Sequence, residues 1–165
     1  MKDKVVVVNT SPFIFLDKFG KLEALLELYK EIYSSEGVRS EIKFPQRVVE
    51  FFDKFVVTRA VKDLELDTKL STRFKRFKLG ERESYILYKE INADELLFAN
   101  TYAESLARKL GARVRDISEI PDLDNENKIF LDQQSICDYY LSLWVAGYRP
   151  KHLRKLLVTR GLISS

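Results

Sequence analysis

The chain has 165 residues, of which 45% are hydrophobic and 32% charged, and its net charge is +3 at neutral pH. This composition is typical of one globular domain over residues 1–165 and argues against a disordered or fibrous chain. A single cysteine and a single histidine argue against a disulfide framework, a zinc finger and a Cys–His catalytic pair. Apolar runs fall far short of the ~20 residues of a membrane span, so we expect a cytoplasmic protein with no membrane partner.

The first half of the chain predicts one strand followed by helices. Val5–Val8 is a run of β-branched residues typical of a strand buried on both faces, and the polar residues 9–12 end it. Helices are expected over residues 13–19 and 21–33, the second because apolar residues recur at i, i+3, i+4 and i+7. Residues 38–42 start a helix or a short extended piece, and Pro45 opens a further helix.

The second half predicts two more strands separated by a helix. A helix runs from Gly80 to Glu90, residues 96–99 form a buried strand, residues 101–110 a helix, and residues 113–117 a third strand. Residues 118–134 are predicted to be a loop or insert, and the C-terminal helices lie within residues 135–165. This order of elements predicts an α/β fold with a mainly parallel sheet.

Polar side chains follow two of the predicted strands. Asn9 and Asn100 end their strands, and Glu41 and Glu81 lie near helix ends that would reach the same edge of the sheet. Such an oxygen-rich cup suits Mg²⁺ or Mn²⁺, although two amides in place of carboxylates lower its negative charge. The alternative is plain capping, with the asparagines as N-caps and the glutamates as helix-start residues.

A basic stretch with interleaved aromatics is the candidate nucleic-acid surface. Phe74 and Phe77 lie among its cations, and such a segment can contact phosphates and stack on bases. The alternative is a solvated helix face with two core phenylalanines. The cations are Lys69, Arg73, Lys75, Arg76, Lys78 and Arg82.

Successive blocks of the sequence resemble a PIN-domain protein of the archaeal and bacterial group related to toxin-type ribonucleases. The blocks are Val6–Ile14, Gly20–Tyr29, Val38–Ile42, Leu79–Ser84, Ala93–Asn100, Ala107–Gly111 and Leu141–Pro150. The resemblance covers nearly the whole chain except residues 118–134. It implies a three-layer α/β/α sandwich and a homodimer, and the richness in Lys, Arg and Glu suits a thermophile.

The resemblance also assigns roles to particular positions. Asn9 stands where such proteins carry their first metal-binding aspartate, and Asn100 stands where an Asp-Asp pair usually ends its strand. Glu41 and Glu81 match the second and third acids, and would be the metal ligands. Thr10 and Ser11 match the hydroxyl residues that hold the first acid and a metal-bound water. Glu104, one turn after Asn100, is a displaced acid or part of a solvated helix face.

Three functions follow as hypotheses. The first is a PIN-fold protein with a degenerate metal site that associates with RNA, or with a protein partner, and has weak or no nuclease activity. The second is a Mg²⁺- or Mn²⁺-dependent endoribonuclease that uses Glu41 and Glu81. The third is a non-catalytic interaction module whose surface is made by Tyr139, Tyr140, Leu143 and Trp144.

Overall fold

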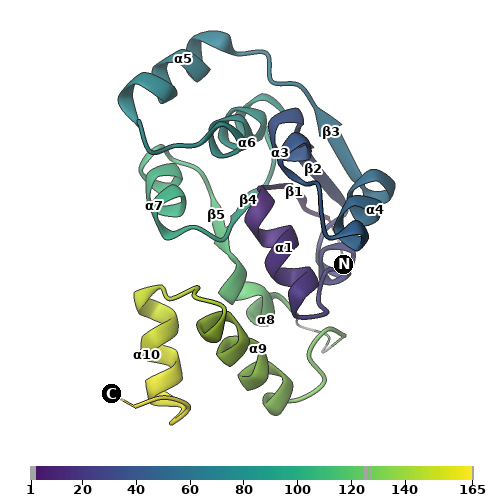
Figure 1. Cartoon of the computed structure of the whole chain (residues 1–165), viewed down its shortest axis with the longest axis vertical. Coiled ribbons are helices and arrows are strands. Elements are labelled where there is room, and N and C mark those ends of the chain that lie inside the picture. Colours follow the sequence, from purple (N-terminus) through teal and green to yellow (C-terminus); the bar gives the residue numbers. More distant parts are fainter. Residues whose placement is uncertain (1–2, 125, 127, 165) are drawn as a thin grey trace.

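A five-stranded parallel sheet forms the centre of the protein (Figure 1), in the strand order β3-β2-β1-β4-β5. The computed structural model describes residues 3–124, 126 and 128–164. All four neighbouring strand pairs are parallel. The strands are β1 (Val5–Val8), β2 (Glu31–Ser35), β3 (Val56–Arg59), β4 (Glu95–Phe98) and β5 (Val114–Asp116). The predicted α/β fold with a parallel sheet is confirmed.

Both faces of the sheet are covered, because neighbouring residues of the central strands point into two different cores. Val6, Val8 and Leu97 belong to one core and Val7 and Leu96 to the other. The first core also receives side chains from α1 (Thr10–Lys18), α2 (Ala24–Leu28), α4 (Gln46–Phe55), α9 (Gln133–Val145) and α10 (Lys151–Thr159). The second receives them from α5 (Leu64–Arg73), α6 (Leu79–Glu90) and α7 (Thr101–Lys109). This is the three-layer α/β/α sandwich.

The strand register brings the predicted site to one edge of the sheet. Val8 pairs with Leu97, and Phe98 pairs with Asp116. The residues that follow β1 and β4 therefore leave the sheet beside each other, and the last residue of β5 lies at the same edge. In parallel sheets this carboxyl edge is where ligands bind.

The helix predicted over residues 21–33 is wrong in its second half. Helix α2 ends at Leu28, Tyr29 is extended, and residues 31–35 form β2. The i, i+3, i+4 pattern holds as far as Tyr29, but Ile32 is buried because it faces the core from a strand. Short apolar segments satisfy both periods, and the pairing of β2 with β1 decides between them.

Strand β3 was not predicted from the sequence. It follows α4 without an intervening turn, so no Gly, Pro or Asn marks its start. It is an edge strand that pairs only with β2, and only Val56 is even half-buried. A weakly buried edge strand carries little apolar pattern, which is why the sequence did not reveal it.

Two short helices lie within the segment predicted to be a loop or insert. They are η1 (Ile117–Glu119) and α8 (Ile120–Leu123), and Ile117 and Ile120 are fully buried. Beyond them the Asp124 carboxylate accepts backbone N–H groups of residues 128–130. Within this segment, residues 125 and 127 lie outside the described part. The two C-terminal helices are confirmed as α9 and α10.

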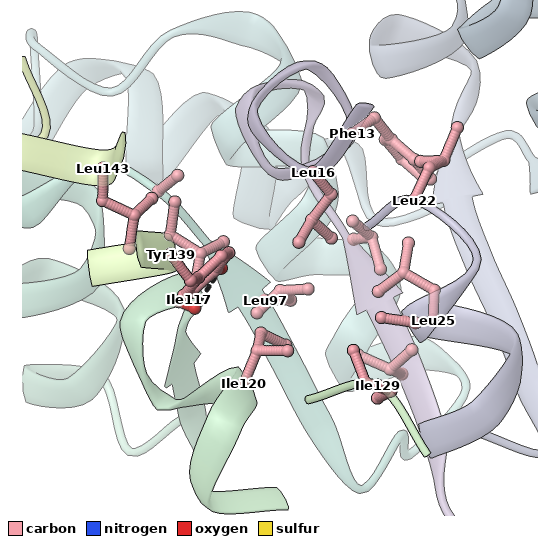
Figure 2. Close-up of a cluster of buried hydrophobic side chains, with 14 of the residues drawn as sticks. Phe13, Leu16, Leu22, Leu25, Leu97, Ile117, Ile120, Ile129, Tyr139 and Leu143 are labelled. Atoms are coloured by element: carbon pink, nitrogen blue, oxygen red, sulfur yellow. Dashed lines mark hydrogen bonds between the residues drawn. The ribbon is translucent and has the colours of Figure 1, made fainter. Parts of the chain in front are cut away.

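The aromatic face of α9 is core. Tyr139, Tyr140 and Leu143 are buried, and Tyr139 donates its hydroxyl hydrogen to the carbonyl oxygen of Ile117 at 2.7 Å. Figure 2 shows Tyr139 and Leu143 packed beside Ile117 at one end of the first core. The hypothesis that these side chains form an interaction surface is therefore wrong, because they attach α9 to the sandwich.

No helix in the described ranges is long and apolar enough to cross a bilayer.

Candidate functional site

Asn9 directly follows β1, and its side-chain oxygen accepts no hydrogen bond from the described residues. Its backbone N–H continues the ladder by donating to Leu97, at 3.1 Å, and its side chain is 4% exposed. The amide does not cap α1, and its Oδ1 is buried without a hydrogen-bond partner in the described part of the chain. A buried acceptor left in this way costs free energy, so it is a position where a water, an ion or a ligand group would be stabilised.

Glu41 reaches the site from helix α3 (Glu36–Glu41), which Ser35 caps by accepting the N–H of Val38 at 3.1 Å. It is the last residue of α3, so the interpretation of Glu41 as a helix-start residue is wrong. Its Oε2 accepts a hydrogen bond from the Thr10 hydroxyl. Thr10 therefore holds this carboxylate beside the end of β1, while Ser11 is half-buried in the first turn of α1.

The closest packing at the site is between α3 and α6. A Cβ placed on Gly80, in the first turn of α6, would lie 2.8 Å from Oε1 of Glu41. In the reverse direction, Gly37 of α3 donates its N–H to Oε2 of Glu83 at 2.7 Å, and a Cβ there would overlap that carboxylate. In each of the two helices, the absence of a Cβ on a glycine leaves room for a glutamate side chain of the other helix.

We expect Gly80→Ala to release Glu41 without unfolding the protein. Alanine is favoured over glycine in a helix by about 1 kcal/mol, and the end of the exposed Glu41 side chain can move away from the new methyl group. The net change in unfolding free energy should stay within about 1 kcal/mol, while the Thr10–Glu41 coupling energy in a double-mutant cycle disappears. Gly37→Ala is the matched control, because it displaces Glu83 instead and should leave that coupling intact.

Glu81 and Asn100 are joined by a hydrogen bond whose direction is fixed. Asn100 caps α7, because its Oδ1 accepts the N–H groups of Tyr102 and Ala103 at 3.0 and 3.3 Å. Its Nδ2 must therefore face Glu81, and it donates to Oε1 at 2.8 Å. The other carboxylate oxygen of Glu81 accepts the N–H of Lys78 at 2.9 Å. Both oxygens of this buried side chain are satisfied by protein donors.

The charge of Glu81 is nevertheless poorly compensated. Its side chain is 5% exposed. Burial raises the pKa of Glu81 above its usual value, the neighbouring Glu41 raises it further, and the N–H donors of Lys78 and Asn100 oppose the rise. The capping interpretation holds for Asn100 and for Glu81, but it does not account for Asn9 or Glu41.

These residues do not fit a resident divalent ion. Mg²⁺ and Mn²⁺ are bound by oxygen ligands, usually with one or two carboxylates that are free to coordinate the ion. Both Glu81 oxygens and one Glu41 oxygen already accept hydrogen bonds, and Asn9 offers only a neutral amide. Among the residues that the structure describes, no group of three or more His, Cys, Asp or Glu side chains is arranged to hold a metal ion.

A second pair of carboxyl groups lies at the same edge of the sheet, between β5 and α7. Glu104 and Asp116 are both buried, and the Tyr148 hydroxyl contacts both, at 2.7 Å from Glu104 Oε1 and still closer to Asp116 Oδ2. One hydroxyl hydrogen cannot satisfy both contacts, so a second proton is required. Burial, followed by the charge of Asp116, raises the pKa of Glu104 to about 8, so Glu104 holds that proton.

Sequence reasoning found only part of this pair. Glu104 is 6% exposed, so the interpretation as a solvated helix face is wrong. Asp116 was placed only within the predicted strand 113–117, although it ends β5 as Asn9 and Asn100 follow their strands. His152 lies within 2.7 Å of the Ser118 hydroxyl and 3.4 Å from Asp116, both through Nε2. Nothing in the sequence indicated these partners, because α10 brings them from more than 30 residues away.

The basic stretch is divided between α5, the segment after it and α6. Phe77 is buried and Phe74 half-buried in the second core, so the two phenylalanines anchor the segment. Arg82 is held by Asp67 at 3.0 Å and by the carbonyl of Phe77. The remaining five cations are exposed: Lys69, Arg73, Lys75, Arg76 and Lys78.

A family model described as a PIN domain matches residues 5–123, from the start of β1 to the end of α8. This chain belongs to the PIN-domain family. A search of curated proteins gives no match to it. The PIN domain contains the whole sheet and every strand-end residue described above, and membership of the family indicates a nuclease or RNA-associated role.

Helices α9 and α10 lie beyond the matched part of the PIN domain. Tyr148, in the connection between them, supplies the hydroxyl that joins Glu104 to Asp116, and His152 begins α10 beside Asp116. Figure 1 shows the two helices at the opposite end of the molecule from α5. The C-terminal helices therefore complete one part of the site edge of this PIN domain.

The amino-terminal edge of the PIN-domain sheet also has a cavity, of about 230 Å³, lined by Glu95 among others. Glu95 is fully buried and accepts hydrogen bonds from Arg115, Lys4 and Tyr29. Although burial opposes its ionisation, Arg115 and Lys4 lower the pKa of Glu95 to about 2. Its charge is thus compensated within the protein, and we assign the functional site to the carboxyl edge.

Proposed function

We propose that this PIN-fold protein associates with single-stranded RNA through a degenerate site and has weak or no nuclease activity. The observation that carries the proposal is the hydrogen bond from Asn100 Nδ2 to Glu81 Oε1. A carboxylate at position 100 would place two acids within hydrogen-bond distance, and such a pair requires a proton or a cation. The amide removes that requirement.

The proposed roles follow from the contacts. Asn9 Oδ1 is a buried acceptor without a partner among the described residues, and it is proposed to accept a hydrogen bond from the ligand, such as from a 2′-hydroxyl or a base N–H, once the covering side chains move aside. Glu41, Glu81 and Asn100 are proposed to belong to the same site at the carboxyl edge of the sheet, with Thr10 fixing Glu41. The exposed cations Lys69, Arg73, Lys75, Arg76 and Lys78 are proposed to contact phosphates, and Arg82 to hold the segment in place.

The test measures metal binding, RNA binding and RNA cleavage on the same preparations. Calorimetry with Mn²⁺ is run on the wild type and on Asn9→Asp, and cleavage and binding of unstructured RNA are measured for both. We expect salt-dependent RNA binding by the wild type, no heat of Mn²⁺ binding and no Mn²⁺-dependent cleavage. If the wild-type protein does not bind the RNA even at low salt, the proposal is contradicted.

The alternative is an endoribonuclease that uses the remaining acids with Mg²⁺ or Mn²⁺. The unpartnered Asn9 oxygen, in the residue next to the Thr10 that holds Glu41, is the observation in its favour. Mn²⁺-dependent cleavage by the wild type, lost in both Glu41→Gln and Glu81→Gln, would establish this alternative. Glu83→Gln is the control, because Glu83 lies on α6 close to Glu81 but contacts Gly37 instead.

A protein partner and a homodimer remain predictions from the resemblance. With Tyr139 and Tyr140 buried and Trp144 partly buried against the first core, no surface is assigned to either of them. Sedimentation of the wild type over a range of concentrations measures the oligomeric state directly.

A further inference from the structure

A groove runs between α7 and the start of α10, and it begins where the strand-end site ends. Its volume is about 550 Å³, and Thr101, Ser105, Arg108 and Lys109 line it from α7. Lys151 and His152 line it from α10. Thr101 directly follows Asn100, so the groove lies next to one of the strand-end residues.

The positive charges of the groove are largely uncompensated. Arg108 has one distant ion pair, 3.9 Å from Glu119. Lys109 and Lys151 have no ion pair within residues 3–124, 126 and 128–164. The acid in the lining, Glu104, is buried and shares protons with Tyr148 and Asp116, so it adds little negative charge at neutral pH. The groove therefore presents three cations and hydroxyl donors to its contents.

The start of α10 adds to this field. Its first turn contains Lys151 and His152 and no acidic residue. A helix N-terminus already carries a partial positive charge, so cations there are unfavourable for the helix itself. A bound anion would offset this unfavourable positive charge, because the anion would interact with both the side-chain cations and the free N–H groups of the first turn.

We propose that the groove between α7 and α10 binds the phosphate backbone of single-stranded RNA, with Arg108, Lys109 and Lys151 contacting phosphates. The inference rests on the RNA association proposed above and assigns it a second surface, separate from the basic stretch at residues 69–82. It also gives the C-terminal helices a role in binding. A polyanion suits the groove because spaced single charges on two helices match a chain of phosphates better than one compact ion.

The experiment compares two variants of equal net charge by fluorescence anisotropy with a labelled, unstructured oligoribonucleotide. The groove variant is Arg108→Gln with Lys151→Gln. The control is Lys30→Gln with Lys89→Gln, two exposed lysines at the amino-terminal edge of the sheet, where Lys30 precedes β2 and Lys89 lies in the last turn of α6. Thermal unfolding of both variants checks that they fold.

We expect the groove variant to bind RNA about tenfold more weakly at moderate salt, with the control close to the wild type. The slope of log Kd against log salt should fall by about 1.4, which is two phosphate contacts at about 0.7 each. Equal binding by the groove variant and the control would overturn the inference alone. If the wild type binds no RNA, the proposed function fails first.

A second ligand separates phosphates from an acidic protein segment. A labelled polyglutamate peptide is titrated into the wild type and the groove variant under the same conditions. Weak binding of the peptide, unaffected by the two substitutions, is expected for a phosphate groove. Peptide binding as tight as RNA binding and lost in the groove variant would overturn the inference in favour of an acidic protein partner.

Discussion

Asn100→Asp is expected to destabilise the metal-free protein by about 2–4 kcal/mol at pH 8, because it replaces an N–H donor by a second carboxylate. The new oxygen would lie where Nδ2 now lies, 2.8 Å from Oε1 of a Glu81 that is already buried and hard to ionise. Aspartate retains the cap of α7, since its other oxygen still accepts the N–H groups of Tyr102 and Ala103. The loss therefore reports the carboxylate pair alone.

Urea unfolding at two pH values, with and without Mn²⁺, measures this effect. At pH 5 the pair can share a proton and most of the cost should vanish. At pH 8, Mn²⁺ at about 100 times its Kd should restore about 2.7 kcal/mol to the variant and nothing to the wild type. An equal effect of Mn²⁺ on both proteins would show that the amide is not what removes the need for a cation.

A matched control exists on the surface of α9. Gln134 Nε2 donates to the Asp138 carboxylate at 2.8 Å, the same donor, acceptor and distance, but both side chains are exposed. Gln134→Glu creates a like-charge pair in water, where the cost is about 0.5 kcal/mol. The difference between the two substitutions measures what burial adds to the carboxylate pair.

The second large effect is a loss of stability as pH rises, caused by Glu104. Its pKa of about 8 in the folded protein lies above the usual value of 4.5, so the folded state holds the proton more tightly than the unfolded state. The contribution of Glu104 to stability is therefore largest at acidic pH, falls as pH rises from about 4.5 towards 8, and then levels off. The total loss should be on the order of 2–4 kcal/mol.

Glu104→Gln should remove most of this pH dependence. The amide resembles the protonated acid in shape and in its ability to donate to Tyr148 or Asp116. At pH 5 the variant should match the wild type within about 1 kcal/mol, and at pH 9 it should be the more stable of the two. Urea unfolding at several pH values measures both. His152→Gln is the control for the other titratable side chain at Asp116, and a wild-type pH slope in Glu104→Gln would contradict the assignment.

Two buried glutamates at this edge of the sheet, Glu81 and Glu104, are stabilised in different ways. Glu81 is paired with an amide that donates a hydrogen bond, which opposes the rise in the pKa of Glu81 caused by burial without a second acid or a cation. Glu104 and Asp116 instead share hydrogens through Tyr148. Asn9 is the exception, because its oxygen has no partner among the described residues. A hydrogen-bond donor brought to Asn9 by a water or a ligand would therefore be stabilised at this position.

Several features were determined by the sequence alone, because they depend on local chemistry. The run of four valines predicts a strand buried on both faces, because apolar side chains then point to both sides of the sheet. Periodicity and breakers predicted α4, α6, α7, α9 and α10, and polar residues after two strands predicted the edge that carries the site. The PIN-domain resemblance, carried by the order of successive sequence blocks, is confirmed by the family match.

Other features were decided only by the tertiary structure, because they depend on which segments become neighbours. Residues 31–35 fit a helix by period and became a strand because β1 offers a pairing edge. Asn100 became a donor to Glu81 only because α6 begins beside the start of α7. Glu104, Asp116 and Tyr148 are distant in sequence, and their meeting requires the register of β5 and the return of the chain after α9. Composition and local pattern contain no information on such contacts, so the protonation of this site could not be predicted from them.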